Sequence, residues 1–310
     1  MGAAAASGGI ERKRGPPPLL ENRPLPWLAP LLLLLGLFYL YPLIDVVRLS
    51  FTDISSIGGP YRYSLASFAN VLLSVDFAEM ARITAIFVAA SVAGQLLLGL
   101  LIAALLIAGE RRGLPGAALV RSVVLIGWIL PGVVVGIIWK LMLDESPSGI
   151  LAYLLSLLGV RDPVFLSAAG PALFWVIIAN VWRGTAFSMI LQYAGMKTIP
   201  PELYEAAILD GAGSWQQFFY LTLPSLQRII LINLVLITTA TLNTFDMIVS
   251  LTGGGPGRAT EVVALFIYNA VFVQFSIGRG AAVAVLLALF GVALMVGYFR
   301  LFFADDGETA

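Results

Sequence analysis

The chain has 310 residues, of which 59% are hydrophobic and only 12% are charged. Soluble domains carry about 25% charged residues, so this composition excludes most soluble enzymes and indicates a polytopic membrane protein. Basic and acidic residues number 18 each, which gives no excess positive charge for binding nucleic acid. Cysteine and histidine are absent, which excludes disulfides, Cys/His zinc sites, and thiol or histidine catalysis.

Residues 1–25 have low sequence complexity and are predicted to form a flexible cytoplasmic tail. The apolar stretch 24–44 is longer than the apolar core of a secretory signal, which has about 7–15 residues, so we expect an uncleaved membrane span there. A six-span transmembrane domain is predicted over 26–303. Residues 304–310 are predicted to form a second, acidic cytoplasmic tail.

Six uncharged stretches approach or exceed the roughly 20 residues that a helix needs to cross the hydrocarbon core. They are 24–44, 83–109, 122–139, 163–182 (continuing past Arg183 to about 195), 229–245 and 280–299. The stretch 262–278 has 17 residues and contains Asn269, Gln274 and Ser276, and we interpret it as an interfacial or re-entrant helix. Residues 150–160 should lie at the membrane surface between the third and fourth spans.

The orientation follows from the lysines and arginines of short loops, which favour the cytoplasmic side. The first tail contributes Arg12, Lys13 and Arg14, and the first loop on the same side contributes Arg111 and Arg112. Both termini are therefore expected to be cytoplasmic.

The lysines Lys13, Lys140 and Lys197 do not fit the GxxxxGK[ST] pattern of a phosphate-binding loop. The glycine-rich run 253–257 lacks the required lysine and hydroxyl, and is predicted to be a tight turn. If this chain supports active transport, the energy must therefore come from a partner or from an ion gradient.

The segment 198–224, between the fourth and fifth predicted spans, is too long for a plain connection. Pro200 and Pro201 suit the first turn of a helix, where a missing N–H costs little, and Glu202 complements the helix dipole there. Gly211 is expected to end this helix, because glycine tolerates the left-handed conformation.

A second short helix is predicted to start at Ser214, which with Gln217 forms the pattern of a capping box, and to end at Pro224. Small residues such as Ala206 and Ala207 leave a surface on which another protein can pack closely. The alternative interpretation from the residues alone is an ordinary interfacial helix.

These residues carry a family resemblance. Glu205-Ala206-Ala207, then Gly211, then the run 221–224 (Leu-Thr-Leu-Pro) resembles the EAA loop of permease subunits in binding-protein-dependent ABC importers. The residues 199–204 and Asp210 narrow the resemblance to the sugar-permease family, which includes maltose-type and glycerol-phosphate-type permeases. The family implies an all-α membrane protein with six transmembrane helices in the type I ABC importer permease fold, and with a cytoplasmic coupling helix.

The resemblance also implies partners and a mechanism. A second homologous permease would complete the path, two ATP-binding cassette ATPase subunits would bind ATP and magnesium, and an extracytoplasmic solute-binding protein would deliver a sugar, polyol or glycerol-phosphate solute. This chain would hold no cofactor or metal and would lie among the lipids of a bacterial or archaeal plasma membrane. The residues carried over as ATPase-coupling residues are Glu205, Ala206, Ala207, Asp210 and Gly211. Glu205 is suited to charge-assisted hydrogen bonds with a basic group of the partner.

Polar residues inside spans point to function, since they are costly in lipid. Arg183 lies in the fourth apolar stretch, close to Asn180 and Trp182. In the fifth, the helical spacing of Thr239, Asn243 and Asp246 places them on one face. These six residues are the candidates for a hydrophilic substrate path. The alternatives are hydrogen bonds between helices and an internal Arg183–Asp246 ion pair.

Two other functional classes have different sequence signatures. A stand-alone, ion-driven secondary transporter is expected to show inverted repeats and buried ionisable relays, and the sequence shows no clear repeat. A membrane-embedded enzyme is disfavoured by the missing histidine, cysteine and clustered carboxylates. Gly132 and Gly136 form a GxxxG pattern, which is interpreted as close helix packing.

Overall fold

The computed structural model describes residues 25–56 and 58–303, and the predicted tails 1–25, apart from residue 25, and 304–310 lie outside the described residues. The described residues divide into two compact units, one up to Arg48 and the second from Leu49 onwards. The regular structure of the described residues is helical, with one isolated β-bridge between Thr52 and Tyr63.

The first described helix is long enough to cross a membrane, with an apolar span Trp27–Ser50 of 24 residues. It consists of α1 (Leu25–Leu35), a π-helical turn η1 (Gly36–Leu40) and α2 (Tyr41–Ser50). Pro42 has no N–H to donate, and the preceding π-turn is where the hydrogen-bond pattern shifts, with Tyr41 N–H bonded to the Gly36 carbonyl.

The centre of the second unit is the packing of α4 (Val75–Arg111) on α8 (Ala169–Lys197). Glycines on α4 make this close approach possible. A methyl group added at Gly94 would lie 2.7 Å from a Val181 methyl, and one at Gly99 would lie 2.6 Å from Ser188 Cβ. Short α3 (Ala66–Leu72) precedes α4.

The third predicted span is a broken helix. It consists of α5 (Ala117–Ile129) and α6 (Gly132–Met142), which meet at an angle of 102°. Pro131 lies at the break in an extended conformation, where it has no helical N–H to lose. The GxxxG glycines of α6 pack against α13 (Asp246–Leu251): a methyl group would collide with Asp246 Oδ2 at Gly132, and with Ser250 Oγ at Gly136. The close-packing interpretation is confirmed.

The second loop helix ends one residue beyond the predicted Pro224. It consists of α10 (Ser214–Gln217), η2 (Phe218–Thr222) and α11 (Leu223–Ser225). The bend of 67° falls at Leu226, before α12 (Gln227–Leu242). In the π-turn before it, the backbone hydrogen bond spans five residues instead of four, from the Leu223 N–H to the Phe218 carbonyl.

The remaining helices are α7 (Ile150–Leu157), α9 (Pro201–Leu209), α14 (Val263–Tyr268) with η3 (Asn269–Val273), and α15 (Ile277–Phe303). The tight turn predicted over 253–257 is present, with positive φ angles at Gly253 and Gly254. The segment 263–273 is too short to span a bilayer, and its first turn is buried in the protein, where Val263 N–H donates to Thr84 Oγ1 at 2.9 Å.

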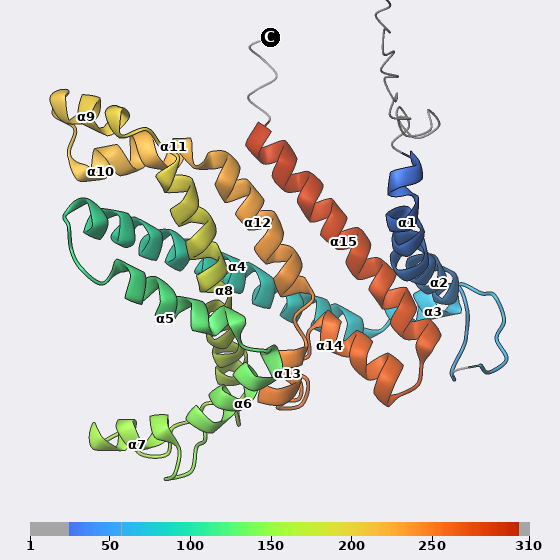
Figure 1. The fold of residues 1–310 in the computed structure, drawn as a ribbon. Helices are drawn as coiled ribbons and strands as arrows, with labels where there is room; N and C mark the ends of the chain where they lie inside the picture. Colours follow the sequence, from blue (N-terminus) through green and yellow to red (C-terminus); the bar gives the residue numbers. More distant parts are fainter. Residues whose placement is uncertain (1–24, 57, 304–310) are drawn as a thin grey trace, which may run out of the picture. The chain divides into compact units, whose positions relative to one another are not determined.

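Over residues 25–56 and 58–303, four helices are long and apolar enough to cross a membrane, or up to six spans if each bent pair is one span. Figure 1 shows α9 and α10 at the same end of the second unit as the C-terminal end of α15, with α7 at the opposite end. A hydrogen bond from Gln227 Nε2 to the Phe302 carbonyl, 3.2 Å, joins the start of α12 to the end of α15.

Candidate solute cavity and coupling loop

A cavity of about 320 Å³ lies between α4, α5, α8 and α12. It combines aromatic walls with a few amide, hydroxyl and guanidinium groups, which is the composition of small-molecule sites. Its lining residues are Gln95, Trp128, Asn180, Arg183, Gly184, Phe187, Leu236, Ile237, Ala240, Thr241 and Thr244.

Gln95 joins the three long helices around this cavity. Its Nε2 donates to the Asn180 carbonyl of α8 at 3.2 Å and to Thr241 Oγ1 of α12 at 3.5 Å. Gly184 leaves room for this amide, because a methyl group there would collide with Gln95 Oε1. The amide is therefore held between the helices by packing on one side and hydrogen bonds on the other.

Asn180 has a buried amide donor that lacks a hydrogen-bond partner in the described part of the chain, next to this cavity. The residue is 4% exposed, and its Nδ2 donates to no partner among the described residues. Buried polar groups are normally hydrogen-bonded, since leaving one unpaired costs about 1–3 kcal/mol. Nδ2 is buried beside the cavity, and a turn of the amide would bring this donor to a hydroxyl or carbonyl oxygen there.

Two aromatic rings form another part of the wall. The rings of Trp128 and Phe187 lie with their centroids 5.7 Å apart and their planes at 36°. Together with the amides they give the cavity both apolar faces and hydrogen-bonding groups.

Arg183 lines the cavity and is paired. Its Nη1 lies 3.6 Å from Asp246 Oδ1. The internal Arg183–Asp246 ion pair, which the sequence analysis gave as an alternative to a role in the substrate path, is therefore present. Trp182, the neighbouring residue, lies outside the lining: its ring packs on Gly127 and, with centroids 6.2 Å apart, on Trp139.

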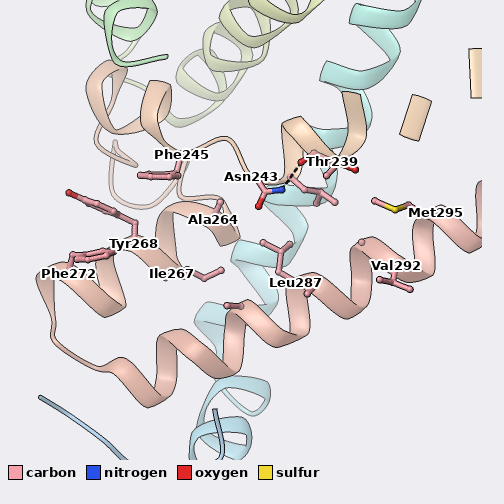
Figure 2. A pocket seen from close by; sticks show the side chains of 14 residues that line it. Thr239, Asn243, Phe245, Ala264, Ile267, Tyr268, Phe272, Leu287, Val292 and Met295 are labelled. Atoms are coloured by element: carbon pink, nitrogen blue, oxygen red, sulfur yellow. Dashed lines mark hydrogen bonds between the residues drawn. The ribbon is translucent and has the colours of Figure 1, made fainter. Parts of the chain in front are cut away.

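The structure does not bring the six predicted path residues together. Asn180 and Arg183 line the cavity, whereas Thr239 and Asn243 line a second one of about 520 Å³ between α12, α14 and α15. Figure 2 shows the rings of Phe245, Tyr268 and Phe272 gathered at one end of this second cavity.

The prediction that Thr239, Asn243 and Asp246 lie on one helix face was wrong for Asp246. Asn243 Nδ2 donates to the Thr239 carbonyl at 2.8 Å, so these two share a face. The helix α12, however, ends at Leu242, and Asp246 begins α13 beyond the break. Its carboxylate therefore points to α6 and to Arg183 instead.

Several lining residues were missed from the sequence: Gln95, Trp128, Phe187, Thr241 and Thr244. Gln95 had a detectable signal, because it is the amide side chain in the uncharged stretch 83–109, whose other polar side chains are the hydroxyls of Thr84 and Ser91. Trp128 and Phe187 had no such signal in the sequence, since aromatic rings are common on lipid-facing and core-facing surfaces alike.

In the loop 198–224, α9 ends as the sequence predicts. Asp210 is its C-cap, Gly211 follows with φ at +80°, and the Ala212 N–H returns to the Ala207 carbonyl at 2.9 Å. The second helix is capped one residue earlier than predicted: Gly213 is the N-cap, and Gln216 Oε1 accepts from its N–H at 2.8 Å. Gly213 has no side chain that could accept a bond from the first turn. The Gln216 side chain still supplies the other half of the capping box, by accepting from the Gly213 N–H.

The proposed coupling residues form an accessible surface. Glu205, Ala206, Asp210 and Gly211 are exposed, and Ala207 is half-buried. The apolar side chain of Leu209 next to them is 88% exposed. Together with Ile208, which is 62% exposed, Leu209 adds apolar surface to this polar face of α9.

At the opposite end, Glu145 fixes the connection that leads into α8. Its Oε1 accepts three backbone hydrogen bonds, from Phe165 and Leu166 at 2.7 Å and from Ser167 at 3.0 Å. Burial raises the pKa of this carboxyl, but the three N–H groups and the Ser167 hydroxyl together outweigh burial and lower the pKa to about 2.

Comparison with known proteins identifies the fold. The chain superposes on a chain in the crystal structure of a bacterial ABC transporter involved in the import of the acidic polysaccharide alginate, with a TM-score of 0.77 at 22% identity. The match covers 89% of this chain and 93% of the other. The fold is thus that of an ABC transporter permease, an all-α membrane protein, as predicted.

Sequence comparison identifies the family. Residues 95–303 match the family described as the binding-protein-dependent transport system inner membrane component, and the chain belongs to this family. It is 35% identical over 279 residues to the trehalose/maltose transport system permease protein MalF of Thermococcus litoralis, with 88% of this chain and 92% of that protein covered. It is 30% identical over 284 residues to the sn-glycerol-3-phosphate permease UgpA of Brucella suis, with 90% and 94% covered. The resemblance to sugar permeases of ABC importers is confirmed.

Proposed function

We propose that this chain is the permease subunit of an ATP-driven importer that takes up a sugar, or a related polyol or glycerol-phosphate solute. It forms the translocation path together with a second homologous permease. The unpaired Nδ2 of buried Asn180, in a cavity with two aromatic rings, is the observation that carries this proposal. A polyhydroxylated solute supplies the oxygen acceptors that this donor lacks.

The named relatives support the solute class. One is a trehalose/maltose permease, another a sulfoquinovosyl glycerol permease of Agrobacterium fabrum at 31% identity, and a third an sn-glycerol-3-phosphate permease. These solutes all present several hydroxyl groups. Arg183 adds a cation to the cavity wall, partly neutralised by Asp246, which is compatible with both neutral and anionic members of the class.

The loop 198–224 supplies the energy coupling in this proposal. The surface formed by Glu205, Ala206, Ala207, Asp210 and Gly211 docks on one of two ATPase subunits, which bind ATP and magnesium. This chain holds no cofactor. An extracytoplasmic solute-binding protein delivers the solute to the other side of the membrane, and both termini lie in the cytoplasm.

The test is reconstitution of the chain with its second permease and ATPase subunits in proteoliposomes. Binding protein loaded with trehalose, maltose or glycerol 3-phosphate is added, and ATP hydrolysis and solute uptake are measured together. We expect one loaded binding protein to stimulate both. Uptake by the purified chain alone, driven by an ion gradient without ATP, would contradict the proposal and favour a secondary transporter.

A further inference from the structure

Two consecutive residues at the end of α4 contact two different elements. Glu110 faces α8, where it forms an ion pair with Lys197 and accepts a hydrogen bond from the Tyr193 hydroxyl at 2.6 Å. Arg111 faces α9, where its guanidinium carbon lies 3.8 Å from the centroid of the Tyr204 ring. The last turn of α4 is thus fixed to the helix of the solute cavity on one side and to the loop helix on the other.

Tyr204 is the buried side chain of α9, with 7% of its surface exposed. Its hydroxyl lies 2.9 Å from Thr222 Oγ1, in the π-turn before the bend at Leu226. By contrast, Ile208 and Leu209 on the same helix are 62% and 88% exposed. The helix α9 is therefore attached to the rest of the protein through Tyr204, with Arg111 on its ring and Thr222 on its hydroxyl.

The helix α4 connects this attachment to the solute cavity without interruption. It runs for 37 residues from Val75 to Arg111 and carries Gln95 into the cavity. At a rise of 1.5 Å per residue, roughly 24 Å separate Gln95 from Arg111 along the helix. The alternative route from Thr222 to α12 passes through the π-turn and the 67° bend, where a displacement is more easily absorbed.

We propose that Arg111 is the positioning residue that ties the loop helix α9 to α4, so that a displacement of α9 shifts Gln95 in the solute cavity. The inference rests on the proposed function, in which an ATPase subunit moves α9. The contact suits this task because a cation over an aromatic face holds the two groups together while allowing a small sliding motion. Glu110, one residue earlier, makes α8 follow the same movement.

The test compares Arg111→Gln, which removes the cation, with Arg111→Lys, which keeps it. The matched control is Arg112→Gln, since Arg112 makes no ion pair or ring contact in the described part of the chain. The full complex is reconstituted in proteoliposomes with loaded binding protein, and the number of solute molecules imported per ATP hydrolysed is measured. We expect this ratio to fall about fivefold in Arg111→Gln, and to stay near the wild-type value in Arg111→Lys and Arg112→Gln.

Two substitutions of Tyr204 separate the route through Arg111 and α4 from the route through Thr222 and α12. Tyr204→Phe keeps the ring under Arg111 but loses the bond to Thr222, and we expect normal coupling. Tyr204→Leu removes the ring and should behave like Arg111→Gln. Normal coupling in Arg111→Gln, or a loss of coupling in Tyr204→Phe equal to that in Tyr204→Leu, would overturn the proposal.

Complex assembly is measured for each variant by co-purification. If Arg111→Gln and Tyr204→Leu both fail to assemble while Arg112→Gln assembles, the contact holds the loop in place and the proposal is wrong. ATP hydrolysis and uptake that fall in equal proportion would likewise contradict the proposal, because the ratio of solute to ATP would then be unchanged. A wild-type complex that shows no ATP-dependent uptake would instead refute the proposed function itself.

Discussion

Arg183 Nη1 lies 3.6 Å from Asp246 Oδ1, so an ion pair joins the middle of α8 to the first residue of α13. The carboxylate fits there because Gly132 of α6 has no side chain; a methyl group at that position would collide with Asp246 Oδ2. Three helices, two of them next to a break, therefore meet at one ion pair on the edge of the candidate solute cavity.

Replacing the carboxylate should change both stability and solute preference. In Asp246→Asn, Arg183 is left without its counter-ion while only 26% of its side chain is exposed. We expect the complex to lose about 1 kcal/mol of stability, an intermediate value for a partly screened pair. The preference for glycerol phosphate over a neutral sugar should increase. Thermal unfolding and competition uptake measure the two effects.

The double variant Arg183→Gln with Asp246→Asn is the control for this prediction. It removes both charges and should recover most of the melting temperature without the shift towards anionic solutes. An Asp246→Asn complex as stable as wild type, with unchanged competition, would mean that the two groups do not interact appreciably.

Asn180→Leu removes the unpaired amide donor from the cavity at similar volume. We expect the apparent affinity for solute in the uptake assay to fall about tenfold, the effect of one lost hydrogen bond to the solute. The melting temperature should hold or rise, because Nδ2 has no partner in the described residues to lose. Ser122→Ala is the control, since that hydroxyl is exposed and bonds to its own helix at Ala118. Unchanged uptake in Asn180→Leu would place the solute elsewhere.

Gly211→Asp tests the coupling loop. Gly211 has φ at +80° and open space around it, so backbone strain rather than a clash limits what it tolerates. We expect Gly211→Asp to abolish uptake at normal membrane abundance, because a charge is added to the proposed ATPase surface, and Gly211→Ala to impair uptake less, with a strain of about 1–2 kcal/mol.

The control for Gly211 is Gly297→Ala, a helical position with equally open surroundings and no positive φ. Uptake and membrane abundance of this variant should match the wild type. Normal uptake in Gly211→Asp would remove the loop from the coupling mechanism.

From the low pKa of Glu145 we predict how the stability of the fold depends on pH. Its pKa is lowered from the ordinary 4.5 to about 2 in the folded protein, so it stabilises the fold above pH 4.5 and this contribution is lost as the pH falls towards 2. Glu145→Gln should therefore lower the melting temperature at neutral pH, and the difference from wild type should shrink on acidification. The control is Glu79→Gln, at a 60% exposed side chain that lies 3.9 Å from Arg82, and it should leave the melting temperature at neutral pH nearly unchanged.

The sequence allowed the helical class and the approximate spans to be predicted, because about 20 apolar residues in a row have few other structures open to them. The bend of the third span was not predicted, although Pro131 lies within that apolar stretch. The break before α12 was predicted at Pro224, two residues from its place at Leu226, but its angle of 67° was not.

The helix ends in the loop 198–224 were predicted almost to the residue because their signals are local: Pro200, Pro201 and Gly211 act on their own turns. The cavity was predicted only in part. Its polar residues come from three helices, and helical spacing within α12 carries no information on which residue α4 places opposite Thr241. The face predicted to include Asp246 assumed an unbroken helix.

Gly184 and Gln95 share one space, since any side chain at 184 would occupy the position of the glutamine amide. The side-chain volumes at the two positions are therefore coupled: a larger residue at 184 is accommodated only when the residue at 95 becomes smaller. In evolution or in redesign, the room in the candidate cavity is thus governed by this pair together, and a change of size at one position calls for a compensating change at the other.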